Sequence, residues 1–72
     1  MTIVVGDVVR RDPKFWKNDR SKFKVTAIHE GWCYIVRLAD DGTIAREENV
    51  WTGVWEDGAS VPYMESELVK EN

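Results

Sequence analysis

The sequence predicts an all-β fold in a single domain over residues 1–72, either a small barrel or a sandwich. Three observations predict this class. Short runs rich in β-branched and aromatic residues recur along the chain. Turn-forming pairs, namely Glu30-Gly31, Asp41-Gly42 and Asp57-Gly58, lie between the runs. No long stretch has the period of an amphipathic helix. Short strands separated by frequent turns are typical of small barrels and sandwiches.

The first predicted element is a short strand at residues 8–10. A β-branched run at residues 2–5 precedes it, and Gly6-Asp7 separates the two. The opening is therefore either two strands joined by a turn or one bulged strand. A loop follows at residues 11–21, because Pro13 disfavours helix at the residue before it. The loop contains Phe15-Trp16, and we expect these aromatic side chains to pack over the mouth of the barrel.

The most specific signal is a β-hairpin at residues 23–38. Two apolar runs flank Glu30-Gly31, and glycine supplies the positive φ that a two-residue hairpin loop needs. With this loop, four cross-strand pairs should share the buried face. They are His29 with Trp32, Ala27 with Tyr34, Val25 with Val36, and Phe23 with Leu38. The opposite face is predicted to be the wetter one; it carries Lys24, Thr26, Ile28, Cys33, Ile35 and Arg37.

The rest of the chain, after residue 38, is predicted as short strands and one helical turn. Residues 43–47 continue as a strand, and residues 50–55 form another β-type run with Gly53 at its centre. Residues 59–64 are extended, and Pro62 limits them to a sheet edge or a strand end. One helical turn is then expected at Glu65-Ser66-Glu67, before Leu68-Val69 closes the chain as a last short strand.

The two ends of the chain carry a known pattern. The opening reads GDVVRR, and the ending VPYMESELV combines an extended strand, a proline, one helical turn and a short final strand. With the long loop and the hairpin between them, these stretches resemble small SH3-like barrels, a group that includes the KOW-type modules and short barrels of phage and bacterial proteins. The resemblance implies a five-stranded SH3-like barrel with one short helical turn near the C-terminus. The opening lacks the ALYDY-like motif of peptide-binding SH3 domains, so no functional residue of that family is carried over.

The composition argues against several classes of function. The chain has one cysteine, Cys33, and one histidine, His29, which leaves no disulfide and none of the usual zinc ligand sets. We interpret both residues as structural. Without a phosphate-binding glycine loop, a nucleophile elbow or a metal motif, we expect no enzymatic activity, no metal and no cofactor. A lone thiol fits a reducing, cytoplasmic setting. The apolar run at residues 3–5 is too short for a signal peptide, and no run is long enough to span a membrane.

The four tryptophans are the strongest functional signal. If residues 50–55 form a strand, Trp51 and Trp55 share one face and flank a position, Gly53, that has no side chain. Such a slot fits a partner's side chain, and aromatic residues are enriched at binding hot spots. We therefore predict protein–protein interaction through an aromatic patch made by Trp16, Trp51, Trp55 and Tyr63. Two alternatives stay open. One or both indoles plug the ends of the barrel, or the same aromatics join copies of this chain into a homo-oligomer.

Charge is unevenly distributed along the chain, although the net charge is only −3. Residues 10–24 contain seven basic and two acidic side chains, whereas residues 25–72 contain three basic and ten acidic ones. Basic groups interleaved with aromatic ones suit single-stranded nucleic acid. The alternative function is therefore a KOW-like nucleic-acid-binding module that uses Arg10, Arg11, Lys14, Lys17, Arg20, Lys22 and Lys24. The acidic remainder departs from the KOW pattern and weakens the field that drives such binding.

The acidic side chains at the turns form a third candidate surface. They could raise the association rate and selectivity for a basic partner. The alternative is an ordinary solubilising surface. The set consists of Asp40, Asp41, Glu47, Glu48, Glu56 and Asp57.

Overall fold

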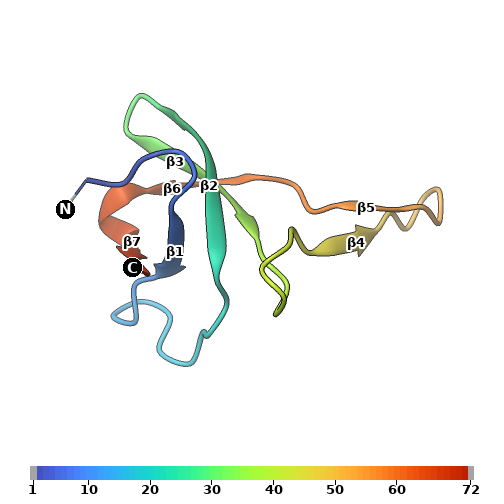
Figure 1. The fold of residues 1–72 in the computed structure, drawn as a ribbon, viewed down its shortest axis with the longest axis horizontal. Coiled ribbons are helices and arrows are strands. Elements are labelled where there is room, and N and C mark those ends of the chain that lie inside the picture. Colours follow the sequence, from blue (N-terminus) through green and yellow to red (C-terminus); the bar gives the residue numbers. More distant parts are fainter. Residues whose placement is uncertain (1, 72) are drawn as a thin grey trace.

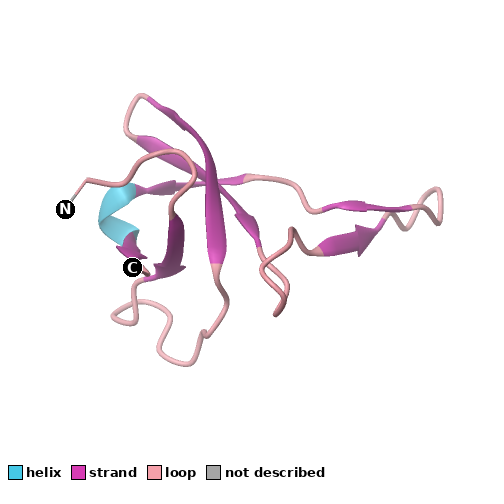
Figure 2. Cartoon of the chain, viewed as in Figure 1, coloured by secondary structure: helices cyan, strands magenta, loops and turns pink. Residues whose placement is uncertain are grey.

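The computed structural model describes residues 2–71 and shows an all-β chain with a single 3-10 turn (Figures 1 and 2). The elements in chain order are β1 (Val8–Arg11), β2 (Phe23–His29), β3 (Trp32–Arg37), β4 (Arg46–Glu48), β5 (Trp55–Asp57), β6 (Val61–Met64), η1 (Glu65–Glu67) and β7 (Leu68–Lys70).

Five of the strands form one antiparallel sheet with the order β6-β3-β2-β1-β7. The first and last strands of the chain are neighbours, with Val9 opposite Lys70 and Arg11 opposite Leu68. The two edge strands, β6 and β7, are joined by η1. Within residues 2–71, no strand pairing between these edges closes the sheet into a barrel. The all-β prediction is confirmed, and the sheet has the five strands expected, but it is accompanied by a separate two-stranded sheet of β4 and β5.

The β2–β3 hairpin turns where the sequence predicts. Glu30 and Gly31 have φ values of 50° and 83°, and positive φ at both positions is the signature of a type I′ turn. The pairing of His29 with Trp32 is also confirmed. Beyond Ala27, however, the register shifts at Thr26, which is the extra residue of a β-bulge.

The bulge makes part of the predicted register wrong. Val25 pairs with Ile35, not with Val36, and Phe23 pairs with Arg37, not with Leu38. Two residues of β2 stand against one of β3 at the bulge, and every pair beyond it moves by one position. A shift of one residue exchanges the two faces of a strand.

The exchange decides which residues of β3 are buried. Cys33 and Ile35, predicted on the wetter face, are each only 1% exposed and pack with the fully buried Val25. Trp32, predicted inside, is 44% exposed, and Tyr34 is half-buried. On β2, Ala27 and His29 are exposed as well. Val36 is buried as predicted, but on the other face of β3 and outside the main cluster.

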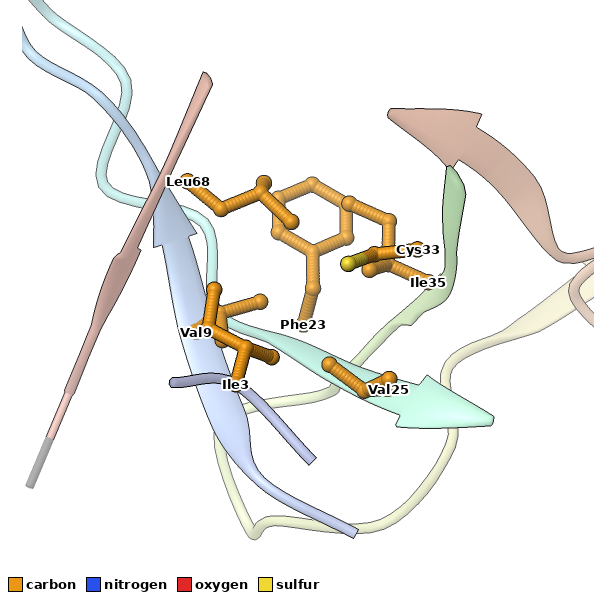
Figure 3. Packing of buried hydrophobic residues seen from close by; sticks show 7 residues of the cluster. All are labelled: Ile3, Val9, Phe23, Val25, Cys33, Ile35 and Leu68. Carbon is orange, nitrogen blue, oxygen red and sulfur yellow. The ribbon is translucent and has the colours of Figure 1, made fainter. Parts of the chain in front are cut away.

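The core lies on the concave side of the five-stranded sheet and is small. Figure 3 shows side chains converging from the N-terminal segment, from β1, β2 and β3, and from β7. Tyr63 of β6 packs against the edge of this cluster. The N-terminal segment contributes although residues 2–5 do not form the predicted strand. The cluster consists of Ile3, Val9, Phe23, Val25, Cys33, Ile35 and Leu68.

The C-terminal predictions are confirmed. The helical turn occupies Glu65–Glu67, and the last strand begins at Leu68. Pro62 lies in β6, which is an edge strand of the sheet. Proline cannot donate a ladder hydrogen bond, and an edge strand has one side that needs none.

The second sheet is a hairpin that projects from the main sheet along the long axis of the molecule (Figure 1). We call residues 45–58 the arm. A backbone hydrogen bond holds its base to the end of β3, because Ala45 N–H donates to Arg37 O (2.9 Å), and Gly58 N–H donates to Ala45 O (2.9 Å) to join the two ends of the arm. A single bridge between Leu38 and Ile44 precedes the arm.

The burial of Cys33 leads to a first prediction. Burial raises the pKa of the Cys33 thiol, and the charge of Glu65 raises it further, so little reactive thiolate is present at neutral pH. We expect a thiol-specific aromatic disulfide to react with the native protein at least about a hundredfold more slowly than with the chain in guanidinium chloride. Absorbance of the released thiolate measures both rates. Equal rates would contradict the placement of Cys33 in the core.

Candidate functional site: the aromatic tip of the arm

The tip of the arm is a tight turn organised by Asn49. Its backbone N–H donates to Val54 O (2.9 Å), and its backbone carbonyl accepts from Gly53 N–H (2.7 Å). Its side-chain Oδ1 accepts from the backbone N–H groups of Trp51 (2.9 Å) and Thr52 (3.3 Å). Asparagine side chains commonly stabilise turns in this way, by bonding to the backbone two residues on. The turn is completed by Gly53, whose φ of 71° is in the left-handed region.

This turn presents four large apolar side chains to solvent. Trp51 is 93% exposed and Val50 is 82% exposed. Val54 and Trp55 are each 57% exposed. Single exposed apolar residues are common on protein surfaces, but here four of them occur within six residues of one protruding element. We call Val50, Trp51, Val54 and Trp55 the aromatic tip.

Below the aromatic tip, the two strands of the arm are acidic. Glu47 stands directly opposite Glu56 in the ladder, and like charges in that arrangement are unfavourable. One guanidinium, that of Arg46, donates from Nη2 to Trp55 O (2.6 Å). Asn49 Nδ2 donates to Glu56 Oε1 (3.2 Å). An isolated two-stranded ribbon is marginally stable in water. The arm therefore keeps an acidic surface and an exposed apolar end at some cost to its own stability.

The arrangement of the two arm tryptophans differs from the prediction. Residues 50–55 do not form one strand, because Asn49 captures the backbone N–H groups of the following turn, and Trp55 is the first residue of β5. Trp51 lies in the turn and Trp55 begins the strand that leaves it, so the two are not alternate residues of one strand. Neither indole plugs a barrel end, since both are exposed.

Trp16 and Tyr63 form a second aromatic cluster, separate from the arm. Their ring centroids are 5.6 Å apart in an edge-to-face arrangement, and Phe15 stands against Trp16 at 5.7 Å. The loop that carries Trp16 lies beside β1 and β2, whereas the arm points away from them (Figure 1). The structure thus divides the predicted aromatic patch into two, and only its part on the arm, Trp51 and Trp55, is exposed.

Arg11 holds the second cluster together. Its guanidinium carbon lies 5.4 Å from the ring centroid of Trp16 and 5.2 Å from that of Phe23, and such contacts are attractive. Its Nε forms an ion pair with Asp19 Oδ2, and its Nη1 donates to Tyr63 Oη (3.2 Å). The hydrogen bond from Arg11 lowers the pKa of Asp19 to about 2.

The basic residues predicted to contact nucleic acid are partly engaged within the chain. Arg11 is committed to Asp19, and Glu71 lies within ion-pair distance of both Arg10 (3.8 Å) and Lys22 (3.4 Å). The other four, Lys14, Lys17, Arg20 and Lys24, are exposed. These contacts lower the positive field on which phosphate binding depends.

His29 and Cys33 lie in opposite environments. His29 is exposed at the hairpin end, with Nε2 3.7 Å from Glu30 Oε1, and Cys33 is enclosed in the core. In the described part of the chain, no three His, Cys, Asp or Glu side chains gather closely enough to hold a metal ion. No helix among residues 2–71 is long and apolar enough to cross a membrane.

Comparisons with protein-family models, with curated proteins and with solved structures return no match.

Sequence reasoning identified Trp51 and Trp55 but missed Val50 and Val54 as part of the same surface. The available signal was Asn49, because an asparagine followed by a glycine four residues later favours a tight turn over a strand. A turn that short has no interior, so its apolar side chains must face solvent or a partner.

The contact between Arg11 and Asp19 leads to a pH prediction. The pKa of Asp19 in the folded chain lies below its ordinary value, so the ionised carboxylate stabilises the folded state above about pH 4. This contribution is lost as the pH falls towards 2. We expect Asp19→Asn to lower the free energy of unfolding by about 1 to 2 kcal/mol at neutral pH and by much less near pH 2.

Urea unfolding at the two pH values measures this difference. Asp40→Asn is the matched control, since Asp40 is an exposed carboxyl group in a turn, and it should change stability by less than about 0.5 kcal/mol at either pH. An equal loss for Asp19→Asn at both pH values would show that the carboxylate charge does not stabilise the loop.

Proposed function

We propose that this chain is a non-enzymatic binding module, built on an SH3-like barrel, whose aromatic tip docks on a protein surface. The observation that carries the proposal is the 93% exposure of Trp51 on a turn whose backbone is held by hydrogen bonds. A side chain of this size gains most from burial against a partner, and tryptophan is among the residues most enriched at hot spots. Because the turn is already ordered, little conformational freedom is lost on binding.

Three features support the SH3-like assignment. A long loop joins β1 and β2, the single turn η1 joins the last two strands, and the last strand pairs with the first. Pro62 comes shortly before η1, as in the pattern by which the sequence resembles this group. We propose a cytoplasmic location, which suits a chain whose only cysteine is unpaired.

The charge of the arm favours protein over nucleic acid or lipid as the ligand of the aromatic tip. Carboxylates at positions 47, 48, 56 and 57 lie behind the tip, and only Arg46 opposes them. Phosphate backbones and anionic membrane surfaces both repel an element of this charge. A protein surface with an apolar pocket and basic residues around it is complementary.

The proposal predicts the effect of removing the indoles. Because both side chains are exposed, the double variant Trp51→Ala, Trp55→Ala should have a nearly unchanged thermal midpoint of unfolding. Its binding to the partner should be at least about thirtyfold weaker, as expected for the loss of a hot spot. A pull-down with the tagged protein, followed by titration of the captured partner, measures the effect. Trp32→Ala is the matched control, since this partly exposed indole is on β3, away from the arm. Full capture by a correctly folded double variant would refute the proposal.

Nucleic-acid contact is a second candidate, favoured by one observation. Phe15 is 64% exposed in the loop between β1 and β2, and Lys14 and Lys17 flank the aromatic pair. This function predicts a shift of a labelled single-stranded oligonucleotide at low salt, which weakens steeply as salt is added. Phe15→Ala should reduce the shift, while Trp51→Ala should not. No shift at low salt removes this candidate.

A further inference from the structure

We propose that the surface which receives the aromatic tip belongs to a second copy of this chain, so that copies join head to tail, arm into groove. The inference rests on the proposed function, and it names the partner. Three observations support this inference: an open groove at the base of the arm, the charge of that groove, and the direction in which the arm points.

The groove lies between the end of the long loop and the end of β3. Its volume is about 740 Å³, and residues 18–22 line one side while residues 37–40 and 42 line the other. Val8 and Leu38 are the large apolar residues of its lining. Pockets that enclose large ligand groups have volumes of about 300 to 1,000 Å³. The groove is therefore large enough for an indole with a neighbouring valine.

The charge of the groove is complementary to that of the arm. Three cations line it: Arg20, Lys22 and Arg37. Of its two carboxylates, Asp19 is neutralised by the ion pair with Arg11, which leaves Asp40. Lys22 lies 3.4 Å from Glu71 Oε1 but is largely exposed, so it can also face a bound arm. The arm brings four carboxylates and one guanidinium, and opposite potentials of this kind steer association and fix its orientation.

The arm cannot occupy the groove of its own chain. Residues 37–42 lead directly into the arm, so the groove is at its base. The aromatic tip is at the far end, and Figure 1 shows the arm extending straight away from the main sheet along the long axis, which measures 39 Å. The contact must therefore be made between two chains.

The contact uses different surfaces on the two copies. Two copies can exchange arms reciprocally, which fills both grooves and closes a two-fold dimer, or each addition can leave one free groove and one free aromatic tip, which produces a larger ring or an open chain. Arm-to-arm packing of two aromatic tips would instead use the same surface twice and stop at a dimer.

Two half-defective variants test the proposal. The tip variant carries Trp51→Ala and Trp55→Ala. The groove variant carries Arg20→Glu and Arg37→Glu, both at exposed positions. The matched control carries Lys14→Glu and Lys17→Glu, which makes the same charge reversal on the loop between β1 and β2 but outside the groove. Circular dichroism and thermal unfolding confirm that each variant is folded.

Sedimentation velocity over a range of concentrations provides the readout. We expect the wild type and the matched control to form dimers or larger species at high concentration and low salt, and high salt to weaken the association by about tenfold. Each half-defective variant alone should be monomeric. An equimolar mixture of the two should form a dimer and nothing larger, because it contains one intact aromatic tip and one intact groove.

Several outcomes would overturn the inference. A wild type that is monomeric at every concentration removes the second copy as the partner; if its lysate capture still depends on Trp51 and Trp55, the proposed function stands. A groove variant that still dimerises, or a mixture of the two variants that stays monomeric while the wild type assembles, indicates arm-to-arm packing. Loss of assembly in the matched control shows that overall charge, not the groove, is responsible.

Discussion

The bulge at Thr26 is the feature on which the rest of the main sheet depends. At the bulge, two residues of β2 lie opposite one residue of β3. This brings Val25, Ile35 and Cys33 to the same face of the sheet, where they form the centre of a small core. The hydroxyl of Thr26 also connects distant parts of the chain, because it donates to Tyr34 O (3.2 Å) and lies 2.9 Å from Ser60 Oγ. The segment that returns from the arm is thereby held beside the hairpin, next to the strand β6 that continues the sheet. The register of the hairpin and the composition of the core both follow from this local irregularity.

The main sheet buries its apolar side chains, whereas the arm exposes them to solvent. In the main sheet, apolar side chains converge from five segments, and Arg11 connects the long loop to Tyr63 and Phe23 by hydrogen bonding and cation–π contact. In the arm, strands of three residues carry facing glutamates and expose two indoles. An element of this kind contributes little to folding. Its exposed apolar area is what a binding surface provides, and the rigid sheet holds it in a defined direction.

Head-to-tail assembly would bring the two halves of the charge distribution together. Residues 10–24 are basic and residues 25–72 are acidic. The arm points away from its own groove, so its carboxylates do not neutralise the basic groove residues of the same molecule. In an assembly, each acidic arm meets a basic groove, and each aromatic tip is removed from water. The uneven charge and the exposed indoles then have one common explanation.

The sequence by itself determined the elements whose signals are local. The Glu30-Gly31 turn, the helical turn at Glu65–Glu67, the final strand and the edge position of Pro62 all follow from backbone preferences of one to three residues. The identification of Trp51 and Trp55 as functional candidates also came from the sequence. Only the tertiary structure decided which face of β3 is buried. The alternation of side chains along a strand does not reveal a bulge, and either alternating set of β3, Cys33 with Ile35 or Tyr34 with Val36, could form the buried face. It also decided that Trp16 belongs to the Arg11 cluster and that the arm stands free, since both depend on contacts between segments distant in the chain.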